Sequence, residues 1–124
     1  MGKSTTGILE GQLKPCPESP NCVCSFQHKD DEEHYIAPET FSENPIEKLA
    51  ALLEKQGLKI VEKNETYLHA TDTSLIFRFV DDFEALYDGD TQTLHFRSAS
   101  RLGRSDFGVN RKRVEKIKSL LQKQ

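Results

Sequence analysis

The chain of 124 residues contains 35% hydrophobic and 30% charged residues and carries a net charge of −3. This length is typical of one domain, so we expect residues 1–124 to form a single domain. No apolar run approaches the roughly 18 residues of a membrane-spanning helix, so no membrane partner is expected. The charged and apolar parts of a secretory signal are missing near Met1, which favours a cytoplasmic location.

The charge is unevenly distributed along the chain. From Arg97 onward there are nine Lys and Arg against two Asp and Glu, whereas the preceding residues hold eight against 18. A basic C-terminal quarter either attracts anions or lies against the acidic remainder and is neutralised within the fold. The domain as a whole is acidic, with a pI of about 5.8, so we expect no nucleic acid partner.

Residues 1–43 show little periodicity and contain four prolines, at positions 15, 17, 20 and 38. Because proline fixes φ and has no N–H group, this segment is predicted to be an irregular arm of loops and extended pieces. The regular elements are expected within residues 44–124.

The first helix is predicted over residues 45–56. Asn44 is a good N-cap, Pro45 suits the first turn, and Glu47 would complete a capping box. Gly57 can adopt the left-handed conformation that ends a helix. One apolar stripe at helical spacing contains Ile46, Leu49, Ala50 and Leu53.

Five strands are predicted to follow, over residues 58–63, 66–71, 74–80, 83–88 and 94–98. Asp81 and Asp82 are expected to interrupt the pattern between the third and fourth strands. The connections are too short for the crossovers that parallel strands need, so the sheet should be an antiparallel meander.

Asn110 is predicted to cap a last helix over residues 111–122, whose apolar stripe contains Val114, Ile117, Leu120 and Leu121. Two such helices would cover one face of the sheet. The predicted fold class is therefore α+β in two layers, with an antiparallel meander of about five strands, two helices on one face and an irregular N-terminal arm.

Cys16, Cys22 and Cys24 lie within nine positions and allow three interpretations. They are small apolar thiols packed under a loop, a disulfide or redox pair of Cys16 with Cys22, or zinc ligands completed by His28 or His34. A reducing compartment would disfavour the disulfide. Because no C-x-x-C pair is present, we assign no metal site, and we identify no cofactor.

The most unusual segment is RSASRLGRSDFGVNRKR, residues 97–113, which combines arginines with serine hydroxyls and two glycines. It leads into the N-terminus of the last helix, where free N–H groups and the helix dipole favour an anion. Arginine matches carboxylate and phosphate groups through paired hydrogen bonds. We therefore predict a site for a small anionic ligand. The candidate ligand-binding residues are Arg97, Ser98, Ser100, Arg101, Arg104, Ser105, Asp106, Asn110 and Arg111.

Two other functions stay open for the same residues. Asp81, Asp82 and Glu84 are supporting carboxylates that could pair with the arginines, so that the network only stabilises a structural, interaction or accessory protein. Alternatively, one of these carboxylates acts as a general base, with Arg97 or Arg101 stabilising negative charge in an enzyme. The oligomeric state does not follow from the sequence.

Four motifs in order, CPESPNCVCS, HYIAP, FRFVDDFE and RSASRLGRSDFGVNRKRVE, resemble the family called domain of unknown function 1499. The resemblance covers the chain from about Leu13 to Leu121. It implies a small uncharacterised protein of a bacterial or plant type and carries over no catalytic residue. Cys24 stands where the family pattern has serine, which leaves Cys16 and Cys22 as the pair of interest. The cysteine-proline arm, the Asp-Asp-Phe-Glu segment and the arginine loop are expected to meet in a mixed-charge pocket at one end of the sheet.

Overall fold

The computed structural model describes residues 5–74, 79–102 and 108–123. Within these ranges no helix is both long enough and apolar enough to span a membrane. The elements follow in the order β1 (Ile8–Leu9), β2 (Gln12–Leu13), β3 (Cys22–Cys24), β4 (Glu39–Thr40), α1 (Ile46–Lys55), β5 (Lys59–Lys63), β6 (Tyr67–Thr73), β7 (Val80–Asp88), β8 (Thr93–Ser100) and α2 (Val109–Gln122).

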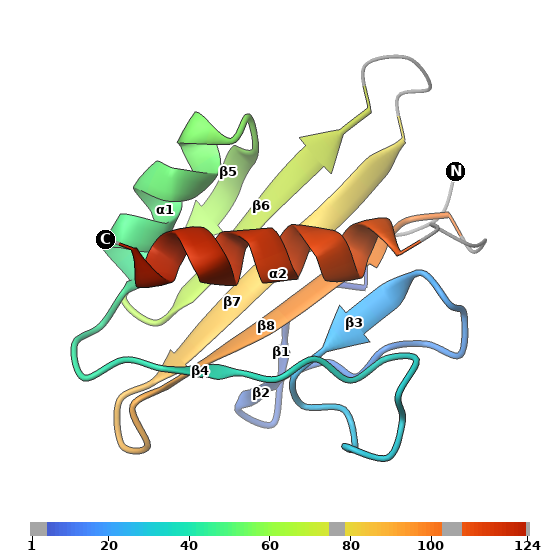
Figure 1. Ribbon diagram of the computed structural model, residues 1–124, viewed down its shortest axis with the longest axis horizontal. Coiled ribbons are helices and arrows are strands. Elements are labelled where there is room, and N and C mark those ends of the chain that lie inside the picture. Colours follow the sequence, from blue (N-terminus) through green and yellow to red (C-terminus); the bar gives the residue numbers. More distant parts are fainter. Residues whose placement is uncertain (1–4, 75–78, 103–107, 124) are drawn as a thin grey trace.

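An antiparallel sheet forms the centre of the molecule (Figure 1). Its main path runs β3-β8-β7-β6-β5, and β4 also pairs with β8. Strands β5 to β8 form a meander in chain order, whereas β3 comes from the N-terminal segment and pairs with β8. The predicted α+β class, with an antiparallel sheet of five main strands and two helices packed against it, is confirmed.

The strand prediction was wrong around the two aspartates. Asp81 and Asp82 lie inside β7, which runs unbroken over Val80–Asp88 and pairs with both neighbours along this stretch. Their charges are accommodated because Asp81 pairs with Arg113 and Asp82 with Arg101. Of the strand predicted over 74–80, residues 75–78 lie outside the described part, and position 80 belongs to β7.

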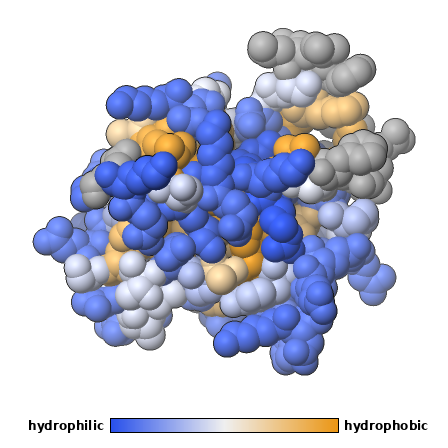
Figure 2. Space-filling model, in the orientation of Figure 1, coloured by the Kyte–Doolittle hydropathy of each residue, from blue (hydrophilic) through white to orange (hydrophobic). Residues whose placement is uncertain are grey.

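The two faces of the sheet differ in chemistry because side chains alternate along each strand. One face is apolar and packs against α1 and α2, which lie in front of the sheet in Figure 1. The strand residues in this core are Val23, Leu68, Ala70, Phe83, Ala85, Tyr87, Leu94 and Phe96. The outer surface of this helical layer is mainly hydrophilic (Figure 2), as expected for amphipathic helices.

The opposite face is covered by the N-terminal segment, residues 5–20, which is called the covering segment or the cover below. Strands β1 and β2 form a small hairpin behind the sheet (Figure 1). Leu13 is almost completely buried there, in a second apolar cluster with Cys24 and Tyr67. The arm is therefore not irregular throughout, because it contributes a strand to the sheet and a cover to one face.

The helix ends differ in detail from the prediction. At α1, the Oδ1 atom of Asn44 accepts a hydrogen bond from the backbone N–H of Ile46 at 2.9 Å, and Gly57 has a φ of 90°. At α2, Gly108 with a φ of 80° precedes the helix. Asn110 was predicted to be the cap, but it lies within the first turn, where its side chain is buried.

Candidate functional site

The face of the sheet beneath the N-terminal segment carries a row of ionisable side chains. Alternation places Tyr67 and His69 of β6, Asp82 and Glu84 of β7 and Arg97 of β8 on this face. In the register of the sheet, Glu84 lies between His69 and Arg97. All five side chains are buried, so the face opposite the apolar core is a buried polar network.

Glu84 is at the centre of this network. Its Oε1 atom accepts a hydrogen bond from Nη1 of Arg97 at 3.4 Å, and its Oε2 atom accepts from the Tyr67 hydroxyl at 2.5 Å. The backbone N–H of Gly7, in the covering segment, also donates to Oε2 at 2.9 Å. Burial, together with the neighbouring Glu84 carboxylate, raises the pKa of Tyr67, which keeps its hydroxyl proton for this hydrogen bond.

Arg97 links the sheet to the covering segment. Its Nη2 atom donates to Oγ1 of Thr5 at 2.7 Å and to the Pro15 carbonyl at 3.5 Å. Its Nε atom is buried and has no hydrogen-bond partner in the described part of the chain. The unsatisfied Nε donor costs stability, whereas Thr5 and Pro15 of the covering segment satisfy Nη2.

Asp82 is the second charged centre on this face. Its Oδ1 atom accepts from His69 Nε2 at 2.7 Å and from Arg101 Nη2 at 2.9 Å, and its Oδ2 atom accepts from Arg101 Nε at 2.9 Å. Burial alone would raise the pKa of Asp82, but the hydrogen bonds from His69 and Arg101 outweigh it and lower this pKa to about 2. A carboxylate with such a low pKa is a weak base at neutral pH.

A pocket of about 230 Å³ adjoins Arg101. It is lined by Thr5, Pro17, Ser19, Asp82, Ala99, Ser100, Arg101 and Leu102. The cysteine-proline arm, the strand that holds the two aspartates and the start of the arginine loop therefore meet in space, as expected from the sequence. The pocket lies at the end of β8, on the polar face of the sheet.

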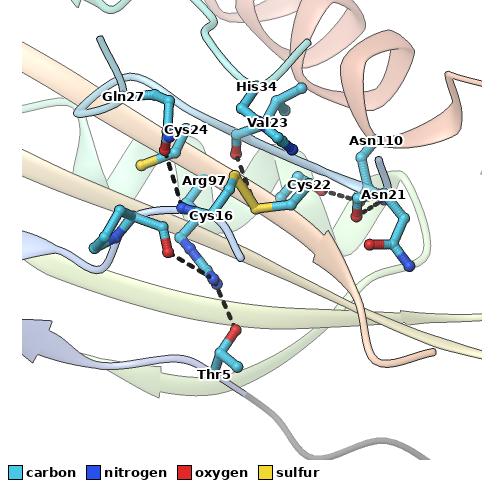
Figure 3. The surroundings of a disulfide bond; sticks show 12 residues. Thr5, Cys16, Asn21, Cys22, Val23, Cys24, Gln27, His34, Arg97 and Asn110 are labelled. Carbon is cyan, nitrogen blue, oxygen red and sulfur yellow. Dashed lines mark hydrogen bonds between the residues drawn. A yellow bond between two sulfur atoms is a disulfide. The ribbon is translucent and has the colours of Figure 1, made fainter. Parts of the chain in front are cut away.

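Cys16 and Cys22 form a disulfide with an S–S distance of 2.08 Å, which decides between the three interpretations of these cysteines. Figure 3 places this bond beside Arg97, whose guanidinium extends toward Thr5. Cys24 is a free, buried cysteine, and burial raises the pKa of its thiol. Among the residues that the structure describes, no group of His, Cys, Asp and Glu side chains is arranged to hold a metal ion.

The loop between the two bridged cysteines is anchored at Asn21 and Ser19. The Asn21 side-chain amide donates to the Leu102 carbonyl, and the Asn21 carbonyl accepts from the backbone N–H of Ser100 at 3.0 Å. Nε2 of His34 bonds the Ser19 carbonyl at 2.7 Å, and Nδ1 of His34 bonds Asp31 at 2.9 Å. This loop is thus tied to the end of β8 beside the pocket.

Some of the predicted ligand-binding residues form a buried network instead of lining the pocket. Asn110 accepts hydrogen bonds from Ser98 at 2.6 Å and from Arg113 at 2.7 Å, and donates to Ser100 at 2.9 Å. Arg113 also pairs with Asp81 at 2.7 Å. This network ties α2 to the sheet strands β7 and β8.

The structure separates the predicted site residues into three groups. Ser100, Arg101 and the supporting Asp82 line the pocket, whereas Arg97, Ser98, Asn110 and the supporting Glu84 are buried away from it. Arg111 lies elsewhere and donates from Nη2 to the carbonyls of Glu32 and Glu33. Arg104, Ser105 and Asp106 lie outside the described residues. A ligand role for each of these residues remains a prediction.

Sequence reasoning missed several members of the site. His69 and Tyr67 alternate with Leu68 and Ala70 in the predicted strand over 66–71, and this alternation is the signal that could have placed them on a polar face. Thr5 and Ser19 carry no such signal, because their position depends on how the arm crosses the sheet.

The model of a family described as "Protein of unknown function (DUF1499)" matches residues 12–121 of this chain. No curated protein and no solved structure matches it. The matched range includes the disulfide, β7, β8 and nearly all of α2, and begins after Thr5 and Gly7, two of the residues of the cover that contact Arg97 and Glu84.

Proposed function

The chain belongs to the DUF1499 family of proteins of unknown function, and we propose from its geometry that it binds a small anionic ligand in the pocket beside Arg101. The single observation that carries this proposal is the partly exposed side chain of Arg101 at the wall of this pocket. The Arg101 side chain is 28% exposed, whereas that of Arg97 is fully buried.

The pocket wall offers hydrogen-bond donors that the described part of the chain does not use. Nε and Nη2 of Arg101 bind Asp82, which leaves the Nη1 donors of the guanidinium without an acceptor there. The Thr5 hydroxyl accepts from Arg97 and so keeps its own proton for a ligand, whereas the Ser100 hydroxyl bonds Asn110 on the helix side of the sheet. Free donors of these two residues favour a ligand with acceptor oxygens.

Charge and size restrict the ligand further. Asp82 neutralises part of the Arg101 charge, so the pocket suits an anion that is held mainly by hydrogen bonds and only weakly by net charge. Its volume of about 230 Å³ lies below the roughly 300–1,000 Å³ of pockets for drug-sized ligands. A single carboxylate or phosphate group with a short attached chain fits these limits.

Isothermal titration calorimetry and thermal shift with inorganic phosphate, acetate and succinate test the proposal. Binding raises the melting temperature by mass action, so at least one anion should stabilise the wild-type protein. Arg101→Gln should abolish this stabilisation, whereas Arg111→Gln, at an arginine away from the pocket, should retain it. An equal loss in both variants, or no response of the wild-type protein to any of the three anions, would contradict the proposal.

A structural or accessory role is the second candidate. It is favoured by the pairing of Arg97, Arg101 and Arg113 with carboxylates. These ion pairs neutralise much of the positive charge that would attract an anion. In this case the three ion pairs act only on stability, and every anion should leave the melting temperature unchanged at constant ionic strength. The enzymatic alternative is less well supported, because the low pKa of Asp82 does not suit a general base.

A further inference from the structure

One wall of the Arg101 pocket belongs to the loop that the disulfide closes. Pro17 and Ser19 line the pocket and lie between Cys16 and Cys22 in the sequence. We propose that the Cys16–Cys22 disulfide is a redox-sensitive latch, whose reduction by an external dithiol releases the segment before Cys16 and with it Thr5, which also lines the pocket.

The two ends of the disulfide are held very differently. Cys22 belongs to β3, pairs with Ala99 of β8 and is 1% exposed, so it is fixed to the sheet. Cys16 is half-buried and precedes the sheet, and its backbone N–H donates to the Gln27 side chain at 3.0 Å. Breaking the bond therefore leaves Cys22 in place and frees Cys16 with the segment before it.

Besides the disulfide, the covering segment is held on the sheet by noncovalent contacts alone in the described part of the chain. They include the hydrogen bonds of Thr5 and Pro15 with Arg97, of Gly7 with Glu84, of Lys14 with Cys24 and of Cys16 with Gln27, and the burial of Leu13. The hairpin formed by β1 and β2 has two residues in each strand, too few to be stable by itself. The disulfide thus provides the covalent part of the attachment.

The chemistry of the latch is an ordinary thiol–disulfide exchange. A thiolate of the dithiol attacks Sγ of Cys16, the more accessible partner, and the S–S electron pair leaves on Sγ of Cys22, which takes up a proton. In the resulting mixed disulfide, Sγ of Cys16 is bonded to the first sulfur of the dithiol. The second thiolate of the dithiol attacks that first sulfur, and Cys16 leaves as a thiol. Two electrons and two protons pass to the protein, and the dithiol becomes a disulfide.

The reactivity of the Cys24 thiol shows whether the cover is in place. It is fully buried, packs in a cluster with Leu13, and its thiol donates to the Lys14 carbonyl at 3.6 Å. Leu13 and Lys14 belong to the covering segment, so release of that segment exposes Cys24 to solvent. Its alkylation rate therefore measures release without any reference to a ligand.

The double variant Cys16→Ser, Cys22→Ser imitates the reduced state and keeps Cys24 as its single cysteine. We expect iodoacetamide to alkylate Cys24 of this variant at least about tenfold faster than Cys24 of the oxidised wild-type protein, since a buried thiol reacts through opening of the structure. Hydrogen exchange should become faster in residues 5–20 while β7 and β8 stay protected. Cys24→Ser, which retains the disulfide, is the control and should keep the slow exchange of residues 5–20. Equal alkylation rates and unchanged exchange would overturn the latch.

The effect on ligand affinity rests on the proposed function, whereas release of the cover does not. If the pocket binds inorganic phosphate, the double variant should bind it roughly tenfold more weakly, because the wall is no longer preorganised. Release of the cover without phosphate binding in either form would contradict the proposed function and support the latch. Equal phosphate binding by both forms, with no release, would support the function and refute the latch.

Discussion

Glu84 and Arg97 lie opposite each other on β7 and β8, and neither side chain exposes any surface to solvent. Removing two charges from water is costly, and their attraction offsets this cost only while both partners are present. The Tyr67 hydroxyl and the Gly7 N–H complete the hydrogen bonding of Glu84. This pair therefore makes the polar face of the sheet sensitive to the loss of any one member.

Replacing Arg97 by Ala should strongly destabilise the protein. The change leaves Glu84 charged, buried and without its guanidinium partner, for which we expect a loss of about 3–5 kcal/mol in the free energy of unfolding. Urea denaturation of Arg97→Ala measures this loss. Arg111→Ala, which alters a half-buried arginine at the molecular surface, should change the same quantity by about 0.5 kcal/mol or less. Similar losses in the two variants would refute the buried pair as a source of stability.

Asp82 should determine part of the stability in acid. Its pKa falls from 3.8 to about 2 on folding, so the ionised carboxylate stabilises the folded state by about 2 kcal/mol above pH 4. As the pH falls from about 4 to about 2, the unfolded chain takes up this proton first, and the contribution is lost. The difference in unfolding free energy between wild type and Asp82→Asn should therefore shrink across this range. Asp90→Asn, which removes an exposed carboxylate, is the control for the change in net charge.

His34 should retain its proton at a higher pH than a free histidine. Burial alone would lower its pKa, but hydrogen bonds to Asp31 and to the Ser19 carbonyl outweigh burial and raise this pKa above 6.5. Both partners accept hydrogen bonds, so the doubly protonated ring satisfies them best. The resulting stability is present below pH 6.5 and is lost as the pH rises through the higher folded pKa. A ring-carbon NMR titration with a midpoint at or below 6.5 would contradict this assignment.

Gly57 should resist substitution because of its backbone conformation. With a φ of 90° after α1, it adopts a geometry that costs residues with a Cβ atom about 1–2 kcal/mol. Gly57→Ala should lower the free energy of unfolding by this amount, although a Cβ atom there would meet no neighbouring atom. Gly89 provides the matched control. Its φ lies outside the positive region in which residues with a Cβ atom are strained, and a Cβ atom there would make only ordinary contact with Tyr87. A thermal unfolding series on both variants distinguishes strain from crowding.

The class of the fold could be predicted from the sequence because its main signals are local. Apolar stripes at helical spacing in α1 and α2, and alternation in β6 and β8, depend only on neighbouring residues. The pairing of β3 with β8 could not be predicted in this way, since Cys22–Cys24 is three residues long and its partner strand lies more than 70 residues later. The pairing of such a short strand is determined by its tertiary contacts and not by its own sequence pattern.

The aspartates in β7 illustrate a second limit. Two adjacent acidic residues are typical of a turn, and this preference led to the wrong boundary. In the strand, Asp81 and Asp82 point to opposite faces, so that one meets Arg113 of α2 and the other meets Arg101. Each charge is neutralised by a partner that is distant in sequence, and local reasoning had no access to either pair. The pocket depends on the same distant contacts.

The N-terminal cover also dictates an order of events during synthesis. Cys16 and Cys22 are separated by six positions and can be joined as soon as both have left the ribosome. Thr5, by contrast, contacts Arg97 across a separation of 92 residues, and Gly7 contacts Glu84 across 77. The segment that holds Thr5 and Gly7 must therefore wait until β7 and β8 have been synthesised before it docks, so the charged side of the sheet is sealed late.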